Sequence, residues 1–295
     1  MIKFLLSVLK RKIIVWHYNY TKNAHKKPFY PYLKYNDSIT NTWYISPGYK
    51  EHLNNCIDSY VKKDYKDFFI DVGANIGLMT ASNWEKFDNL YCFEPNNLVF
   101  KILETNISIS CNEKKVKLFN VGLGLEKGKY NLKIPKHNFG GAFLEENNEY
   151  SDKTLLEKEG FYVNEIYNYI TTEINIESGD FLNENVFNEF KKEYKGVVKI
   201  DVEGYELQIL ELILNTINVS KVVIIFENWQ NLDKEIIEKM IVKNNFSSFK
   251  IKYIKWLDSF FDKIKSKSIY SNLICLDENE SYIPKKCDVI LEIEN

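Results

Sequence analysis

The residues best placed for chemistry lie at the ends of apolar runs. The run FFIDV reaches Asp71, and Gly73 and Gly77 then frame a tight turn into a helical segment. Glycines permit a close approach to a ligand, and the N–H groups at a helix start favour an anionic group. In the spacing D-x-G-x-x-x-G, Asn75 stands where the dinucleotide-binding pattern needs its middle glycine. The turn is therefore predicted to bind an anionic group other than a pyrophosphate.

A second acidic residue, Glu94, ends the next apolar run, 23 residues after Asp71. An acidic side chain at this place accepts hydrogen bonds from ribose hydroxyls. The alternative is a charge at the start of the following helix. A ribose contact, combined with a turn that holds a small carboxylate through backbone N–H groups and Asn75, describes S-adenosylmethionine. Val121 and Gly122 close the third predicted strand, where the adenine edge would lie.

The segment VVKIDVEG (197–204) supplies further carboxylates. Asp201 is predicted to be a general base or a contact to the cofactor's amino group, with Glu203 second, because side chains two apart on a strand share a face. The alternative is that Glu203 caps the next helix and Asp201 only orders the turn. Lys199 shares the face of Asp201 and is expected to keep a carboxylate ionised. Glu227 ends the fifth strand and could orient the acceptor. It could also join Asp201 around a divalent metal ion, although a metal site is not predicted.

The elements that position these residues alternate regularly. Strands are predicted at 68–73, 89–95 and 116–122, with helices between them. This β-α-β-α-β order predicts a parallel sheet with right-handed crossovers. Residues 123–195 interrupt the order and are expected to form an insertion over the carboxyl ends of the strands, where such sheets bind ligands. Within it, His137 is either a surface histidine or a second candidate base.

The alternation resumes with strands at 197–204 and 221–229. The segments FKIKY and SNLICL are expected to close the sheet as an antiparallel pair. Residues after 280 are expected to form a tail. Residues 1–66, rich in aromatic residues and lysine, are expected to form an extension that packs on the domain. The alternative is a face that touches an anionic membrane surface or glycan.

The charge distribution and the composition indicate which partners and which location to expect. Residues 1–36 carry eight basic side chains and no acidic one, which leaves 31 basic against 41 acidic residues in the rest of the chain. The single arginine, Arg11, argues against sequence-specific nucleic-acid binding, because arginine supplies the planar fork for phosphate and guanine. Five scattered cysteines fit a reducing cytoplasm. No apolar stretch approaches the roughly 18 residues of a membrane span.

The segments FIDVGANIG, FEP, HNFGGAF, VVKIDVEGYE and NLIC, in this order, resemble an FkbM-type S-adenosylmethionine-dependent methyltransferase. The resemblance covers roughly residues 67–276. It implies an α/β, Rossmann-like class I methyltransferase fold with a seven-stranded, mostly parallel sheet and an antiparallel last strand. An insertion before the fourth strand and an N-terminal extension complete it. One departure is IESGD at 176–180, where the family usually shows a Thr-Leu-Asp-Asp type segment.

We therefore expect a cytoplasmic methyltransferase domain at 67–280, between an extension at 1–66 and a tail at 281–295. It is expected to transfer a methyl group from S-adenosylmethionine to a hydroxyl of a sugar, nucleotide-sugar, glycan precursor or other small metabolite, and not to nucleic acid. The alternatives are a nicotinamide-dependent oxidoreductase, against which Asn75 argues, and a non-catalytic binding protein that retains the fold. The expected catalytic residues are Asp201, Glu203 and Glu227. The expected cofactor-binding residues are Asp71, Gly73, Ala74, Asn75, Gly77, Glu94, Pro95, Val121, Gly122 and Asp201.

Overall fold

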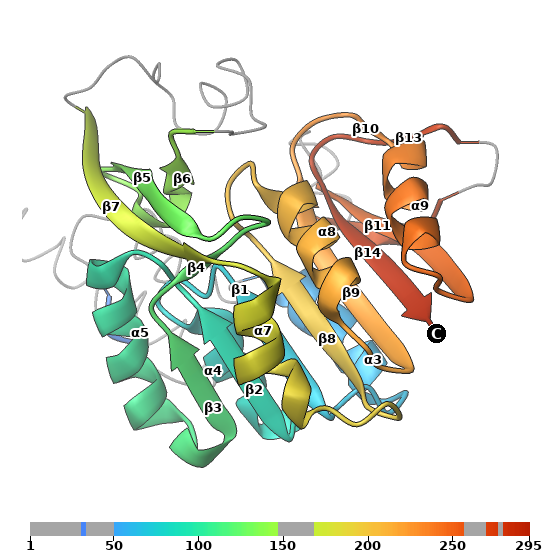
Figure 1. Ribbon diagram of the computed structural model, residues 1–295, viewed down its shortest axis with the longest axis horizontal. Helices are drawn as coiled ribbons and strands as arrows, with labels where there is room; N and C mark the ends of the chain where they lie inside the picture. Colours follow the sequence, from blue (N-terminus) through green and yellow to red (C-terminus); the bar gives the residue numbers. More distant parts are fainter. Residues whose placement is uncertain (1–30, 34–49, 147–167, 257–269, 277–279) are drawn as a thin grey trace, which may run out of the picture.

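The computed structural model describes residues 31–33, 50–146, 168–256, 270–276 and 280–295. They form a large mixed sheet with helices on both faces and a smaller sheet beyond one end of it (Figure 1). This is the α/β Rossmann-like methyltransferase fold that was predicted. The aromatic residues on which the hypothesis of membrane contact depends lie outside the described residues, apart from Tyr32.

The large sheet has eight strands in the order β12-β11-β14-β9-β8-β1-β2-β3. Their bounds are β1 (Phe68–Val72), β2 (Asn89–Phe93), β3 (Val116–Phe119), β8 (Lys195–Ile200), β9 (Lys221–Asn228), β11 (Ser248–Trp256), β12 (Tyr270–Cys275) and β14 (Cys287–Glu294). From β3 to β9 every neighbouring pair is parallel. The carboxyl ends of β1, β2, β8 and β9 therefore meet along one edge, as the alternating pattern predicted.

The interpretation of residues 281–295 as a tail is wrong. β14 runs antiparallel between β9 and β11, with eight paired residues on each side. It is an antiparallel strand that was not expected, and its residues Val289, Leu291 and Ile293 are buried in the core. β11 and β12 form the predicted closing antiparallel pair. β12, at the edge, is therefore the last of the seven expected strands, and β14 is the eighth.

Helices cover the two faces of the large sheet. The first face is covered by α3 (Glu51–Val61), α4 (Leu78–Asn83) and α5 (Asn97–Ser110), and the second by α7 (Gly179–Asn185), α8 (Glu206–Thr216) and α9 (Lys234–Lys243), which Figure 1 shows in front. Within the predicted extension, α3 packs Leu53, Ile57 and Tyr60 into the core of the first face. Residues 50–66 therefore belong to the domain. No helix in the described ranges is long and apolar enough to cross a membrane.

A smaller sheet lies above the carboxyl ends of the strands (Figure 1). Its order is β4-β7-β5-β6, with bounds β4 (Gly122–Leu123), β5 (Gly128–Pro135), β6 (Phe143–Leu144) and β7 (Tyr169–Glu177). A two-stranded ribbon joins β10 (Leu232–Asp233) to β13 (Tyr282–Ile283). The insertion predicted at 123–195 is thus a sheet up to Glu177. Beyond it, α7 packs on the large sheet as an ordinary crossover helix.

Candidate active site

The glycine turn between β1 and α4 closes on the protein itself. Gly73 has a φ of +76°, and a Cβ there would lie 1.9 Å from the Asp201 carbonyl oxygen. Only glycine permits this contact between the ends of β1 and β8. Gly77 has a φ of +86°, and its Cβ would meet Leu103 of α5 at 2.7 Å. Both glycines are therefore needed for the fold.

The N–H groups of this turn all donate to protein oxygens. Those of Gly73 and Ala74 reach the Phe93 carbonyl oxygen, each at 3.0 Å, and that of Gly77 reaches the Ala74 carbonyl oxygen at 2.9 Å. The Asn75 N–H donates to Glu94, and the Ile76 N–H donates to the Asn75 side chain at 2.7 Å. In the free protein these N–H groups are therefore already bonded within the protein, one of them to the Glu94 carboxylate, and a bond from them to a cofactor carboxylate stays a prediction. The N–H donors of the turn can be recognised in the sequence, but the acceptors Phe93 and Glu94 at the end of β2 cannot.

Glu94 lies at the end of β2, and two backbone N–H groups fix its carboxyl group. Oε1 accepts from Asn96 at 2.8 Å, and Oε2 accepts from Asn75 at 3.0 Å. Burial raises the pKa of Glu94 to about 7, against the lowering effect of these two hydrogen bonds. An ionised carboxylate oxygen can accept a second hydrogen bond. Two adjacent hydroxyls, such as those of a ribose, would therefore fit the remaining capacity of Glu94.

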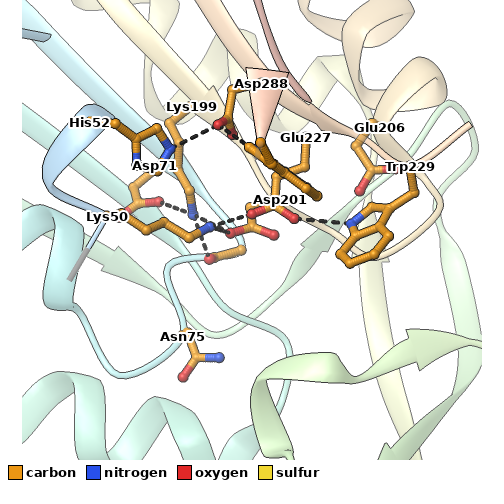
Figure 2. A network of polar contacts seen from close by, with 12 residues as sticks. Lys50, His52, Asp71, Asn75, Lys199, Asp201, Glu206, Glu227, Trp229 and Asp288 are labelled. Carbon is orange, nitrogen blue, oxygen red and sulfur yellow. Dashed lines mark hydrogen bonds and ion pairs between the residues drawn. The ribbon is translucent and has the colours of Figure 1, made fainter. Parts of the chain in front are cut away.

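A charged network follows at the ends of β1, β8 and β9 (Figure 2). Lys199 lies 3.0 Å from Asp71 and 3.4 Å from Asp201, and its ammonium group donates to the Gly73 carbonyl oxygen. Lys199 therefore shares the face of Asp201, as predicted. Asp71 is fully buried and accepts from Thr80 of α4 at 2.8 Å. Asp71 thus holds Lys199 and Thr80 in place without lining the pocket itself.

Lys50 joins the two outer carboxylates of this network. Its Nζ lies 2.6 Å from Asp201 Oδ2 and 2.5 Å from Glu227 Oε1 (Figure 2). The indole N–H of Trp229 donates to Glu227 Oε2 at 3.3 Å. Lys50 was not among the predicted site residues, because it lies in a segment without periodicity. The chain has many lysines, so the residue type alone does not single out this one.

Glu203 is not on the strand face of Asp201. β8 ends at Ile200, and Glu203 has a φ of 54° in the turn that follows. The argument that side chains two apart on a strand share a face therefore does not apply to it. The N–H of Gly204 donates to the Glu206 carboxylate at 3.0 Å, so Glu206 has the helix-start role that was considered for Glu203.

These groups line one pocket between the large sheet and the smaller sheet. The predicted residues that line it are Gly73, Ala74, Asn75, Glu94, Pro95, Gly122, Asp201, Glu203 and Glu227. Asp71, Gly77 and Val121 are not among its lining residues. β3 ends at Phe119, so Gly122 belongs to β4 and not to the predicted third strand. Apolar residues of the smaller sheet, including Leu132, Leu144 and Ile176, form the opposite wall.

Two other expectations concern residues near this pocket. His137 is exposed and does not line the pocket, which fits the surface interpretation. Among the described residues, no group of three or more His, Cys, Asp or Glu side chains is arranged to hold a metal ion.

The sequence model of the methyltransferase FkbM domain matches residues 71–249, more than half of the chain. The chain belongs to the FkbM methyltransferase family. This FkbM protein is therefore an S-adenosylmethionine-dependent methyltransferase, and the alternative of a nicotinamide-dependent oxidoreductase is wrong. The match begins after Lys50 and ends before β14, so both lie outside what the family description covers.

Solved structures resemble the FkbM protein at low identity. A Klebsiella pneumoniae protein assigned provisionally as an O-methyltransferase has 8% identity and a TM-score of 0.43, over 85% of this chain and 83% of its own. A Clostridium thermocellum protein assigned in the same way as an rRNA methylase has 10% identity and a TM-score of 0.41, over 84% and 97%. The M. jannaschii protein TYW2, in complex with AdoMet, has 11% identity and a TM-score of 0.35, over 81% and 74%. No curated protein sequence matches this chain. At such low TM-scores nothing is carried over from these proteins.

The donor and acceptor groups of the pocket fit S-adenosylmethionine. Glu94 offers acceptors for ribose hydroxyls at one end. Lys50 and Asp201 offer opposite charges at the other, where the cofactor carries an ammonium and a carboxylate group. The apolar wall of the smaller sheet suits a flat adenine ring.

Proposed function

We propose that this FkbM protein methylates a hydroxyl group of a sugar, glycan precursor or similar small metabolite. The observation that carries the proposal is the pair of carboxylates, Asp201 and Glu227, which end adjacent parallel strands and line the pocket beside the glycine turn. When bound, S-adenosylmethionine supplies an electrophilic methyl group on a sulfonium. What the protein must add is alignment, exclusion of water and an acceptor for the hydroxyl proton.

The two carboxylates lie at different distances from the glycine turn. The Asp201 N–H donates to the Val72 carbonyl oxygen at 3.0 Å, directly before the turn. Glu227 lies one strand further out, on β9. We therefore assign Asp201 to the cofactor's amino group and Glu227 to the acceptor, where it takes the proton from the hydroxyl. Glu203, which also lines the pocket, is the second candidate for this proton.

Water is excluded by the smaller sheet. Leu144 and Ile176 are buried at 6% and 3% exposure while lining the pocket, so the roof over the site is already apolar in the free protein. A hydroxyl held beneath this roof is shielded from competing water, which favours transfer to the acceptor. The scarcity of arginine supports a small acceptor over a nucleic acid, and the unpaired cysteines support a cytoplasmic reaction.

The test is to incubate the protein with S-adenosylmethionine and a panel of nucleotide-sugars, and to look for the gain of one methyl group by mass spectrometry. The Glu227→Gln variant should lose about 10² to 10⁴-fold in turnover with little change in affinity for S-adenosylhomocysteine. Glu104→Gln, at an exposed position of α5, is the matched control and should keep full activity. A methyl group found only on nitrogen or carbon, or full activity of Glu227→Gln, would contradict the proposal.

A further inference from the structure

The start of α3 is held in one place by a buried contact. His52 Nε2 lies 2.8 Å from Asp288 Oδ2 (Figure 2). The Trp256 indole N–H donates to the same oxygen at 2.7 Å. Asp288 is 1% exposed, so this contact fixes the first turn of α3 to β14. Lys50, two residues before His52, has left-handed backbone angles of φ 46° and ψ 42°. A residue other than glycine keeps such angles only when its surroundings enforce them.

The enforced backbone directs the Lys50 side chain into the pocket. Its ammonium group lies between Asp201 and Glu227, and the side chain is 16% exposed. The other ammonium group that lines the pocket, that of Lys199, is 6% exposed and contacts Asp71, Asp201 and the Gly73 carbonyl oxygen. Lys50 is therefore the more accessible of the two cations that the described lining residues provide.

The cofactor's amino-acid end needs such a cation. Its carboxylate was expected to bind the N–H groups of the glycine turn, but all five from Gly73 to Gly77 donate to protein oxygens. A carboxylate that enters the pocket without a donor would lose its hydration at a large energetic cost. A cation supplied from outside the turn removes this cost, and Lys50 is in reach of the same pocket.

We propose that Lys50 binds the carboxylate group of the cofactor's amino-acid end, while Asp201 takes its ammonium group. The proposal concerns cofactor binding by the FkbM protein and does not depend on which acceptor is methylated. In the free protein, carboxylate, ammonium and carboxylate alternate from Asp201 through Lys50 to Glu227. The zwitterionic amino-acid end of the cofactor can bind among these three charged groups by exchanging ion pairs with them. Its ammonium replaces Lys50 at Asp201, and its carboxylate takes the released Lys50, so no charge is left buried and unpaired.

The experiment compares three ligands by isothermal titration calorimetry. S-adenosylhomocysteine carries both charged groups, decarboxylated S-adenosylhomocysteine carries only the ammonium, and 5′-methylthioadenosine carries neither. For Lys50→Met we expect affinity for S-adenosylhomocysteine to fall about 30-fold, since a hydrogen bond to a charged group is lost. Affinity for 5′-methylthioadenosine should stay within about twofold. Affinity for the decarboxylated ligand should stay equal or rise, because its ammonium then meets two carboxylates without a competing lysine.

Two further variants separate charge from fold. Lys50→Arg keeps the positive charge and should retain most of the affinity for S-adenosylhomocysteine. Lys62→Met, at the exposed end of the same helix, should bind all three ligands as the wild type does. Thermal unfolding of each variant checks that it folds.

Three outcomes would overturn the proposal. An equal loss for all three ligands in Lys50→Met would show that Lys50 only shapes the pocket. Unchanged affinity for S-adenosylhomocysteine in that variant would show that Lys50 does not reach the cofactor. Failure of the wild type to bind S-adenosylhomocysteine would also overturn it. A wrong acceptor, in contrast, would show itself only in the mass-spectrometry panel and would leave these binding results unchanged.

Discussion

The two faces of the large sheet differ in chemistry although the same strands build both. On the second face, under α7, α8 and α9, apolar residues lie near the carboxyl ends of the strands, as with Val72, Ile200 and Phe226. On the first face, the positions next to these in the chain are Asp71, Lys199 and Glu227. Alternation along each strand therefore concentrates the charges on the side of α3.

This difference shows what each face contributes to the site. The apolar face is stabilised by burial, in addition to the backbone ladders that pair the strands. The charged face is stabilised by ion pairs that share their members, since Lys199 contacts both Asp71 and Asp201. A shared network of this kind can exchange partners with a charged ligand, whereas an apolar face cannot.

The largest effect is expected when the charged face is made apolar at one position only. Asp71→Leu leaves Lys199 buried without its 3.0 Å partner and removes the acceptor of the Thr80 hydroxyl. The free energy of unfolding, measured in urea, should fall by about 3 to 5 kcal/mol. The double variant Asp71→Leu/Lys199→Met should recover at least half of this loss. A loss below about 1 kcal/mol in the single variant would show that the ion pair between Asp71 and Lys199 does not stabilise the charged face.

A smaller effect is expected when the apolar face is made polar. Val198 is fully buried under α8 on the second face, and Val198→Thr adds a hydroxyl without changing the shape much. The free energy of unfolding should fall by about 2 kcal/mol. Affinity for S-adenosylhomocysteine should not change, because Val198 does not line the pocket. Val242→Thr, at a residue that is 65% exposed, is the control and should unfold as the wild type does.

The sequence was sufficient for the large-sheet strands from Phe68 to Trp256, because each of them has its own local apolar run or alternation. It was insufficient for β14, whose apolar residues were visible but whose partners, β9 and β11, are distant in the chain. The same limit applies to the site. Glu94 and Asp201 were found because strand ends are recognisable, whereas Lys50 enters the site from outside the alternating pattern. Contacts between distant segments have no signature in a local pattern.

The next effect concerns the pH dependence of ligand binding at Glu94. Burial raises its pKa from 4.5 to about 7, so the folded protein holds this proton where the unfolded chain has already lost it. The contribution to stability is therefore full below about pH 4.5 and is lost as pH rises to about 7. Ribose hydroxyls should bind better to the ionised form, since a charged acceptor makes the stronger hydrogen bond.

Affinity for S-adenosylhomocysteine should therefore rise about tenfold between about pH 6 and about pH 8 and then level off, by titration calorimetry. Glu94→Gln should bind more weakly and show no such rise. An equally steep rise in Glu94→Gln would assign the proton to another group and would remove Glu94 from ribose binding.

The smallest effect separates two hydrogen bonds that tie α3 to β14 at opposite ends. His52 contacts Asp288 beside the pocket, and the Tyr60 hydroxyl donates to Glu292 at 2.7 Å, near the start of β9. His52→Leu and Tyr60→Phe should each lower the free energy of unfolding by about 1 kcal/mol, since each loses one hydrogen bond. Only His52→Leu should also weaken S-adenosylhomocysteine binding, by about threefold, because it loosens the backbone that directs Lys50 into the pocket. Equal ligand affinities in the two variants would show that the charged face positions α3 as a whole and does not position Lys50 through His52.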